Sequence, residues 1–405
     1  MTGSAGNGNH DRGRHRPVVV YLAGFRQHAG KTVTSLGIIS QLRKHLDARQ
    51  IGYLKPVGQQ LVRAAGGVTV DKDVELIGEF AGLADLPLDK LSPVRFSTNF
   101  TRSYLDSKYR TRLTRALSLE IKRSVDQLAD RRIIIAEGSG HPGVGSVVGL
   151  SNAAVGKLLG AQTIFVSGAG IGRALDTIDV DLTYFLYHGC RVSGLIVNKV
   201  IPEKAAQVKR YITEDLINQR YAAANGAPMH VFGYMPTIPD LPHPSMRVIL
   251  GALPHVQPLG DPDTIAWRRP CAAIKLVSLP AQHLQSQLRH YVGPGDVLII
   301  GASSTPRIRQ IIEFHEDVLH RGGVGGLILT CGETEKIEPP VREELIRANL
   351  PALFVSEDSA ATEERLFRLY QNTKLQVFDT GKIAEIERLF EEHFETERFL
   401  DVFLS

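Results

Sequence analysis

Short apolar runs alternate with amphipathic stretches through residues 17–250. Each run has the length of a strand, and the runs cover residues 18–24, 51–57, 132–138, 161–168, 192–200 and 230–236. Polar residues hardly interrupt them, which is typical of strands in a parallel sheet that is covered on both faces. Residues 34–46, 73–83 and 104–129 have helical periodicity. This alternation predicts right-handed βαβ units and an α/β fold with a doubly wound, mostly parallel sheet.

A second series of apolar runs follows a proline-rich stretch. Residues 235–246 contain four prolines within twelve positions, so we expect a domain boundary near residue 250. The later runs cover residues 272–278, 295–302, 326–332, 352–358 and 375–381. They predict a second, smaller α/β domain over residues 260–395, after a first domain over 17–250. The amphipathic stretch 383–404 is expected to dock onto its own domain.

Composition excludes several classes of protein. With 405 residues, 43% hydrophobic and 22% charged, the chain is typical of a two-domain globular protein, and no apolar run approaches the ~20 residues of a membrane span. A net charge of +4 argues against nucleic acid as the main partner. The cysteines Cys190, Cys271 and Cys331 form no CxxC pair, which favours a reducing cytoplasm. Residues 1–16, rich in Gly, Asn and Arg, predict a disordered tail without the apolar core of a secretory signal.

The stretch GFRQHAGKT, from Gly24 to Thr32, ends the first strand and opens the first helix. In a phosphate loop, main-chain N–H groups and a helix N-terminus point at phosphate oxygens, while a lysine adds charge and a hydroxyl binds magnesium. Gly30, Lys31 and Thr32 supply these parts. The usual pattern has four residues between its glycines, whereas this chain has five and carries Phe25 where glycine is usual. The sequence therefore predicts an intact but widened phosphate loop.

Other polar residues stand at the ends of strands beside this loop. Lys55 would place a second ammonium group near a transferred phosphoryl group. Glu137 could hold magnesium, directly or through water, next to Thr32. Asp73, with Asp71 as the alternative, could be a second metal carboxylate or only the favourable charge at a helix N-terminus.

Asn198 ends the strand 192–200. Its amide offers a donor and an acceptor to an adenine edge, and the beginning of a turn is the other interpretation.

The widened loop is similar to that of dethiobiotin synthetase and of related proteins, which include the N-terminal domain of long phosphotransacetylases. The resemblance continues in order through YLKPV (53–57), AEGSGHPGVGS (136–146), LSNAAVGKLLGA (150–161), VSGAGIGRALDTID (166–179) and GLIVNKVIPEK (194–204). It covers most of residues 17–250 and is stronger toward the phosphotransacetylase branch than toward the synthetase itself.

This resemblance implies a P-loop domain that binds ATP and Mg²⁺. It implies catalytic roles for Lys31 and Lys55, and metal binding by Thr32, Asp73 and Glu137. The nucleotide-binding residues that it implies are Gly24, His28, Ala29, Gly30, Lys31, Thr32, Val33 and Asn198. It also raises a homodimer as an expectation.

Residues from about 270 to 390 resemble the DRTGG domain of the same long phosphotransacetylases, through YVGPGDVLIIGAS, GGLILTCGE and LPALFVSEDSAATEERL, although the five-letter motif is absent. An unknown small-molecule ligand could bind where its strands end, and ordinary turn chemistry is the alternative for the polar residues there. These residues are Ser303, Ser304, Thr305, Cys331, Glu333, Asp358 and Thr380.

Two functions are favoured at this point over a third, a nonenzymatic scaffold with a decayed site. The first is an ATP-binding protein in which the nucleotide regulates the second domain. The second is an ATP-dependent ligase or synthetase that activates a small carboxylate or carbamate, as dethiobiotin synthetase does. Because the sequence stops before a C-terminal acetyltransferase domain, we do not expect acetyl transfer by this chain alone.

Overall fold

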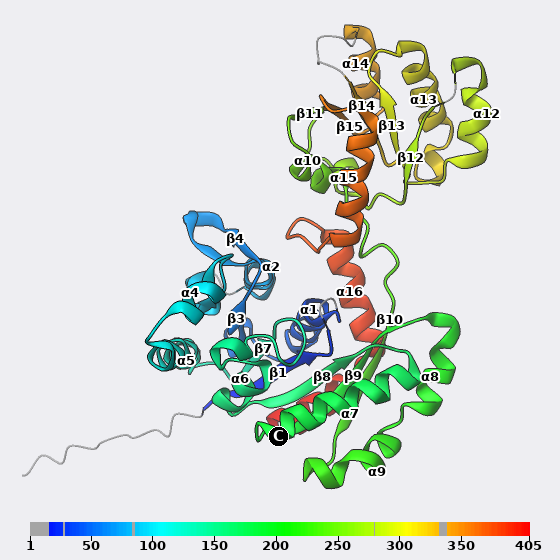
Figure 1. The fold of residues 1–405 in the computed structure, drawn as a ribbon. Helices are drawn as coiled ribbons and strands as arrows, with labels where there is room; N and C mark the ends of the chain where they lie inside the picture. Colours follow the sequence, from blue (N-terminus) through cyan, green and yellow to red (C-terminus); the bar gives the residue numbers. More distant parts are fainter. Residues whose placement is uncertain (1–15, 27–28, 83–85, 279, 332–337) are drawn as a thin grey trace, which may run out of the picture. The chain divides into compact units, whose positions relative to one another are not determined.

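The computed structural model describes residues 16–26, 29–82, 86–278, 280–331 and 338–405 (Figure 1). The expected disordered tail over residues 1–15, His28 and Glu333 lie outside the described residues. The chain divides into two compact units. Unit 1 consists of Met1–Thr237 together with Ala384–Ser405, and unit 2 is Ile238–Ile383.

Unit 1 is built on a six-stranded sheet in which all neighbouring strands are parallel. In spatial order its strands are β10 (His230–Pro236), β9 (Val192–Val200), β8 (Gln162–Ser167), β1 (Val18–Gly24), β7 (Ile133–Glu137) and β2 (Ile51–Leu54). Each lies within one of the six apolar runs, so the predicted parallel sheet is confirmed. Most strand side chains are fully buried, as a sheet covered on both faces requires.

The helices of unit 1 connect these strands. They are α1 (Lys31–Leu42), α2 (Lys72–Ala81), α3 (Leu88–Leu91), α4 (Phe100–Asp106), α5 (Arg110–Asp126), α6 (Asn152–Leu159), α7 (Ile171–Tyr187), α8 (Ala205–Tyr211) and α9 (Glu214–Asn225). Short strands lie between β2 and α5, namely β3 (Val57–Gly58), β4 (Leu61–Arg63), β5 (Thr69–Asp71) and β6 (Val94–Arg95).

The prediction of a single helix over 104–129 is wrong, because α4 and α5 are separate helices there. The hydroxyl of Ser107 accepts the N–H of Tyr109 at 3.1 Å, and this local bond takes the place of a helical one.

The strand order places a topological switch point at β1 and β8. The chain leaves β1 through α1 toward β2 on one side, and it leaves β8 through α7 toward β9 on the other side. Because β1 and β8 are neighbours, their carboxyl ends open a crevice between diverging connections, where ligands of doubly wound folds bind. The widened loop follows β1 and therefore borders this crevice.

The C-terminal helices α16 (Thr380–His393) and α17 (Thr396–Leu404) return to unit 1 from Ala384 onward. The ring of Phe390 packs on Gly37 of α1, and Phe399 lies 5.5 Å from Phe232 of β10. The structure thus differs from the expectation that this stretch docks onto the second domain, because its aromatic side chains complete the core of the first.

Unit 2 has a five-stranded sheet with one antiparallel edge strand. The spatial order is β11 (Val256–Leu259), β15 (Ala352–Val355), β14 (Gly326–Thr330), β13 (Val297–Gly301) and β12 (Ile274–Leu276), with β11 antiparallel to β15 and the other pairs parallel. The second α/β domain is therefore confirmed.

Two of its details differ from expectation. Residues 375–381 form no strand, because the Asp379 carboxylate accepts the Gln376 N–H at 2.9 Å and the Asp379 carbonyl starts α16. Strand β11 was not predicted, since it contains Pro258, a residue that sheets accept at their edges.

Helices cover both faces of the second sheet. Leu298 and Ile300 pack with α12 (Ala281–Tyr291), α13 (Thr305–Asp317) and α14 (Pro339–Arg347) in one apolar core. Val297 and Ile299 point the other way and pack with α10 (Met246–Ala252), α11 (Ile265–Arg268) and α15 (Ser359–Asn372). This alternation follows from the period of two along a strand. Of the helices in the described parts of either unit, none has the length and apolar character to cross a membrane.

Candidate phosphate site

Two glycines of the widened loop leave little or no room for a side chain. Gly30 precedes α1 with φ +95°, and a Cβ there would lie 2.2 Å from Nδ2 of Asn198. A Cβ on Gly24 would lie 3.1 Å from Nζ of Lys31. Among the described residues no side-chain cap is present at α1, and its first turn contains the N–H groups of Lys31, Thr32 and Val33, which are the groups that an anion site at a helix N-terminus uses.

Lys31 joins this loop to the segment after β7. Its ammonium donates to the Gly140 carbonyl at 2.8 Å and to the Arg26 carbonyl at 3.5 Å. Asn152, the first residue of α6, fixes that segment. Its amide donates to the carbonyls of Ser139 and His141 and accepts the N–H of Ser139.

Glu137 lies at the centre of the site and is almost completely buried (1% exposed). Its Oε1 accepts from the Thr32 hydroxyl at 2.9 Å and from the Lys55 ammonium at 2.7 Å. Its Oε2 accepts from the hydroxyls of Ser35 and Tyr53, both at 2.9 Å. Four donors from α1, β2 and its carboxyl end thus converge on one carboxylate. Glu137, Thr32 and Lys55 were predicted from the sequence, whereas Ser35 and Tyr53 were not, because they lie inside a helix and a strand with no motif to mark them.

Lys55 bridges two carboxylates in the buried site. Its ammonium lies 2.8 Å from Oδ2 of Asp73 and 2.7 Å from Oε1 of Glu137. Burial by itself would lower the pKa of Lys55, but the charges of Asp73 and Glu137 raise it above its usual value. Burial raises the pKa of Glu137 and the neighbouring Lys55 opposes that rise. Lys55 therefore stays protonated, and it holds both carboxylates in place.

The structure separates the two candidate aspartates. Asp71 caps α2, because its carboxylate accepts the N–H of Asp73, and it also accepts the N–H groups of Gln59 and Gln60. Asp73 instead reaches Lys55. The contacts thus place Asp73 beside Glu137 and give Asp71 a local structural task.

The expected magnesium donors fit the ion by their chemistry. Thr32, Asp73 and Glu137 offer only oxygen atoms, which Mg²⁺ prefers, and this ion usually keeps several waters and few protein ligands. Across the described residues, no group of three or more His, Cys, Asp or Glu side chains could hold a metal by itself.

Asn198 braces the loop from β9. Its Nδ2 donates to the Ala29 carbonyl at 2.9 Å and its Oδ1 accepts the N–H of Lys199 at 2.8 Å. Both ends of the amide are therefore engaged by the main chain. The adenine contact expected of Asn198 stays a prediction, and the contacts observed add a positioning task for the same side chain.

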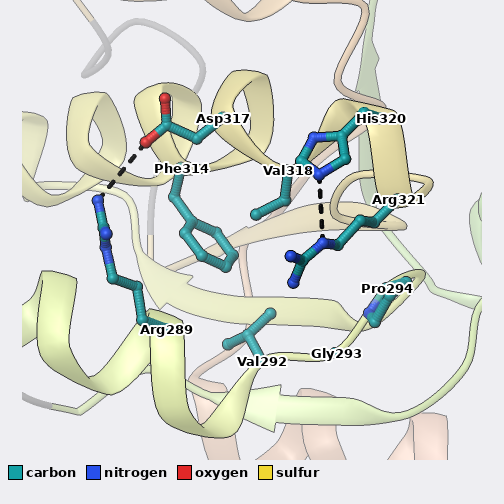
Figure 2. A pocket seen from close by; sticks show the side chains of 9 residues that line it. All are labelled: Arg289, Val292, Gly293, Pro294, Phe314, Asp317, Val318, His320 and Arg321. Carbon is teal, nitrogen blue, oxygen red and sulfur yellow. Dashed lines mark hydrogen bonds and ion pairs between the residues drawn. The ribbon is translucent and has the colours of Figure 1, made fainter.

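Unit 2 has a cavity of about 460 Å³, shown in Figure 2. Its lining comes from segments that precede β13 and β14, with Arg289 3.7 Å from Asp317 and Arg321 3.2 Å from His320. This is the amino end of the parallel strands, opposite the expected ligand site. At the carboxyl end, Asp358 caps α15 and Ser359 bonds to Thr330, so these polar residues satisfy turns and helix ends.

Comparison with known proteins agrees with the P-loop architecture. The AAA_26 family model, described as an AAA domain, matches residues 19–262. A phosphate acetyltransferase from Synechocystis sp. is 24% identical over 404 residues, which cover 94% of this chain and 51% of that protein. The chain thus spans about half the length of this curated relative.

A solved structure also matches part of the chain. It contains the CBS and DRTGG domains of the regulatory region of Clostridium perfringens pyrophosphatase, complexed with the activator diadenosine tetraphosphate. The match covers 35% of this chain and 51% of that chain at 19% identity, with a TM-score of 0.25. With a TM-score this low, the match carries no argument about the fold of unit 2.

Proposed function

The chain belongs to the AAA_26 family of AAA domains, and from its site geometry we propose that it binds Mg·ATP and that the bound nucleotide regulates unit 2. A P-loop domain implies nucleotide binding. The identity of the nucleotide, the magnesium ion and the regulatory task of a DRTGG-like second domain are the further steps of this proposal.

One observation carries the nucleotide site: the hydroxyl of Thr32 and the ammonium of Lys55 meet on a single carboxylate oxygen of Glu137, beside a loop that offers the N–H groups of an uncapped helix. The phosphates would lie on this loop, with Lys31 supplying charge. Magnesium would be held by Thr32, with Asp73 and Glu137 contacting it directly or through water.

In this proposal, the effect of nucleotide binding reaches unit 2 through α1 and α16. Helix α1 begins at Lys31, and its later turns contact α16, where Gln41 donates to the Glu387 carbonyl at 3.3 Å and Lys44 lies 2.9 Å from Glu391. Helix α16 begins at Thr380, within unit 2. A shift of α1 that accompanies phosphate binding would therefore act on a helix whose first turn is part of the second unit.

Hydrogen exchange on the full chain tests this proposal, with and without Mg·ATP, next to a calorimetric titration of the nucleotide. We expect Mg·ATP to bind and to change exchange in unit 2 as well as at the loop. Lys31→Ala should abolish both effects, because the ammonium can no longer reach a phosphate. Lys122→Ala, on the exposed face of α5, is the matched control and should change neither.

The outcomes separate the two parts of the proposal. If Mg·ATP does not bind the parent protein, the proposed function is lost altogether. If Mg·ATP binds but exchange changes only within unit 1, nucleotide binding stands and the regulatory part is refuted.

A second function has one specific observation in its favour. Lys55 is 4% exposed and lies beside the phosphate loop with its pKa raised by Asp73 and Glu137, as expected of an ammonium that neutralises a transferred phosphoryl group. ATP-dependent activation of a small carboxylate or carbamate would use it. The test is ADP release in the presence of small acids and amines, because a purely regulatory protein would show no stimulated turnover.

A further inference from the structure

A second cavity, of about 360 Å³, lies in unit 1 at the switch point between β1 and β8. Phe25, Arg26 and Ala29 of the widened loop form one wall. The segment Gly168–Gly170 and the first turns of α7 form another, and the end of β9 closes the cavity. The volume lies within the range of about 300–1,000 Å³ that small-molecule sites have. Because residues of the widened loop line it, the cavity adjoins the proposed phosphate site.

The charged side chains of this cavity have a single sign. Arg26, Arg173, Lys199 and Lys204 line it, and the other nine described lining residues are uncharged. Burial, with a smaller contribution from the charge of Arg26, lowers the pKa of Lys199. All four side chains are exposed, and the charges of Arg26 and Lys199 repel one another, a repulsion that an anion between them would relieve.

The main chain around the cavity has two features that protein packing does not explain. A Cβ on Gly168 would have nothing within 4 Å, and its φ lies outside the left-handed region, so neither space nor conformation requires glycine there. The 17-residue helix α7 begins after Gly170 with no side-chain cap among the described residues, and its N-terminus borders the cavity. Both features suit a ligand that approaches the main chain closely.

Lys199 has an unusual conformation at the third wall. Its φ is +59°, in the left-handed region that residues other than glycine seldom adopt. The bond from its N–H to the Asn198 side chain holds it there, and Asn198 also holds Ala29 of the loop. Strain of this kind concentrates at functional sites. One amide thus fixes a cation of the cavity relative to the phosphate loop.

We propose that this cavity binds a further phosphate group, carried on the ribose of the same nucleotide whose 5′-phosphates lie on the loop. The inference rests on the proposed nucleotide binding and deepens it. The chain of 5′-phosphates is already matched by the loop, Lys31 and Lys55, so four additional cations exceed what an unmodified nucleoside needs. A ribose that carries its own phosphate would use them.

Calorimetric titration of the full chain tests this proposal with four ligands at one fixed ionic strength. They are ADP, ADP with a phosphate on the ribose 2′ hydroxyl, ADP with a phosphate on the 3′ hydroxyl, and pyrophosphate added to the protein saturated with ADP. We expect one of the ribose-phosphorylated forms to bind at least about tenfold tighter than ADP, the gain of one set of charge-assisted contacts. This advantage should shrink as salt is raised.

Variants tie the preference to the cavity. Arg173→Gln with Lys204→Gln should bring the affinity ratio of the two nucleotides close to one. Gly168→Ala should also lower the ratio without lowering the midpoint of thermal unfolding, because the new methyl group meets only the ligand. Arg115→Gln, exposed on α5, is the control and should leave the ratio unchanged.

Each outcome decides a separate point. Ratios near one for both isomers, together with no binding of pyrophosphate beside ADP, overturn the inference. Pyrophosphate that binds beside ADP in the parent but not in the double variant keeps the phosphate subsite and assigns it to a second ligand. If neither ADP nor ATP binds, pyrophosphate is titrated into the protein alone. Binding that the double variant weakens then means that the proposed function fails and the subsite stands.

Discussion

Replacing Gly37 by alanine tests the contact between α1 and α16. A Cβ on Gly37 would lie 2.3 Å from the ring of Phe390, well inside the ordinary contact distance of about 3.5–4.0 Å. Both residues are buried, so the ring cannot simply turn out into solvent. Overpacking of this kind costs about 1–3 kcal/mol, while alanine in a helix interior gains about 1 kcal/mol over glycine. We expect a net loss of up to about 2 kcal/mol in the free energy of unfolding of unit 1.

A double-mutant cycle makes this prediction specific. In a Phe390→Ala background the ring is gone, so only the helix propensity remains and Gly37→Ala should stabilise by up to about 1 kcal/mol. The assay is urea unfolding followed by circular dichroism. Gly172→Ala in α7, where a Cβ would meet nothing within 4 Å, is the control and should have the same effect in both backgrounds. Equal destabilisation by Gly37→Ala in both backgrounds would refute the packing of α16 on α1.

Three further predictions concern buried charged groups. Lys55→Met leaves two carboxylates without their shared cation and should destabilise unit 1 by about 3 kcal/mol at neutral pH. In acid, part of this loss should be recovered because Glu137 takes up a proton. Urea unfolding at several pH values measures the loss, and an equal loss at every pH would contradict the prediction. Burial raises the pKa of Asp181 to about 7, so ionisation of this carboxyl favours the unfolded chain. The gain in unfolding free energy from Asp181→Asn should therefore grow from pH 3.8 to about 7 and then stay constant. A gain that does not change with pH would be inconsistent with this prediction. Lys382→Met removes the donor to the carbonyls of residues 241 and 243 and the charge beside Asp379. It should lower the free energy of unfolding of unit 2 by about 2–4 kcal/mol. A loss of stability in unit 1 instead would contradict this assignment of Lys382 to unit 2.

The sheet of unit 1 could be predicted from sequence because its signals are local. Each central strand is a nearly unbroken apolar run, and the alternation with helices leaves few topologies. Prediction failed where a local pattern met a tertiary contact. Residues 375–381 have strand character, but Asp379 uses its carboxylate and carbonyl to begin α16. The stretch around Pro258 lacks strand character, but it pairs at the sheet edge.

The candidate site divides in the same way. Gly30, Lys31 and Thr32 were identified because their order along the chain is their arrangement in space. Ser35 and Tyr53 were not identified, because their hydroxyls can donate to Glu137 only when α1 and β2 lie beside β7. The link from Lys31 to the Gly140 carbonyl likewise joins segments whose proximity no spacing rule gives.

The widening of the loop has a physical reason in this arrangement. Phe25 stands where the usual pattern has glycine, and its ring meets Phe165 of β8 edge-on at 5.7 Å, so the first residue after β1 is fixed to the neighbouring strand. With that anchor in place, the loop extends over the switch point, where Arg26 lines the cavity and its carbonyl accepts the ammonium of Lys31. A shorter, glycine-rich loop would have neither the anchor nor the arginine. The added length therefore connects the phosphate site to the cationic cavity, which is why we expect a ligand that reaches both.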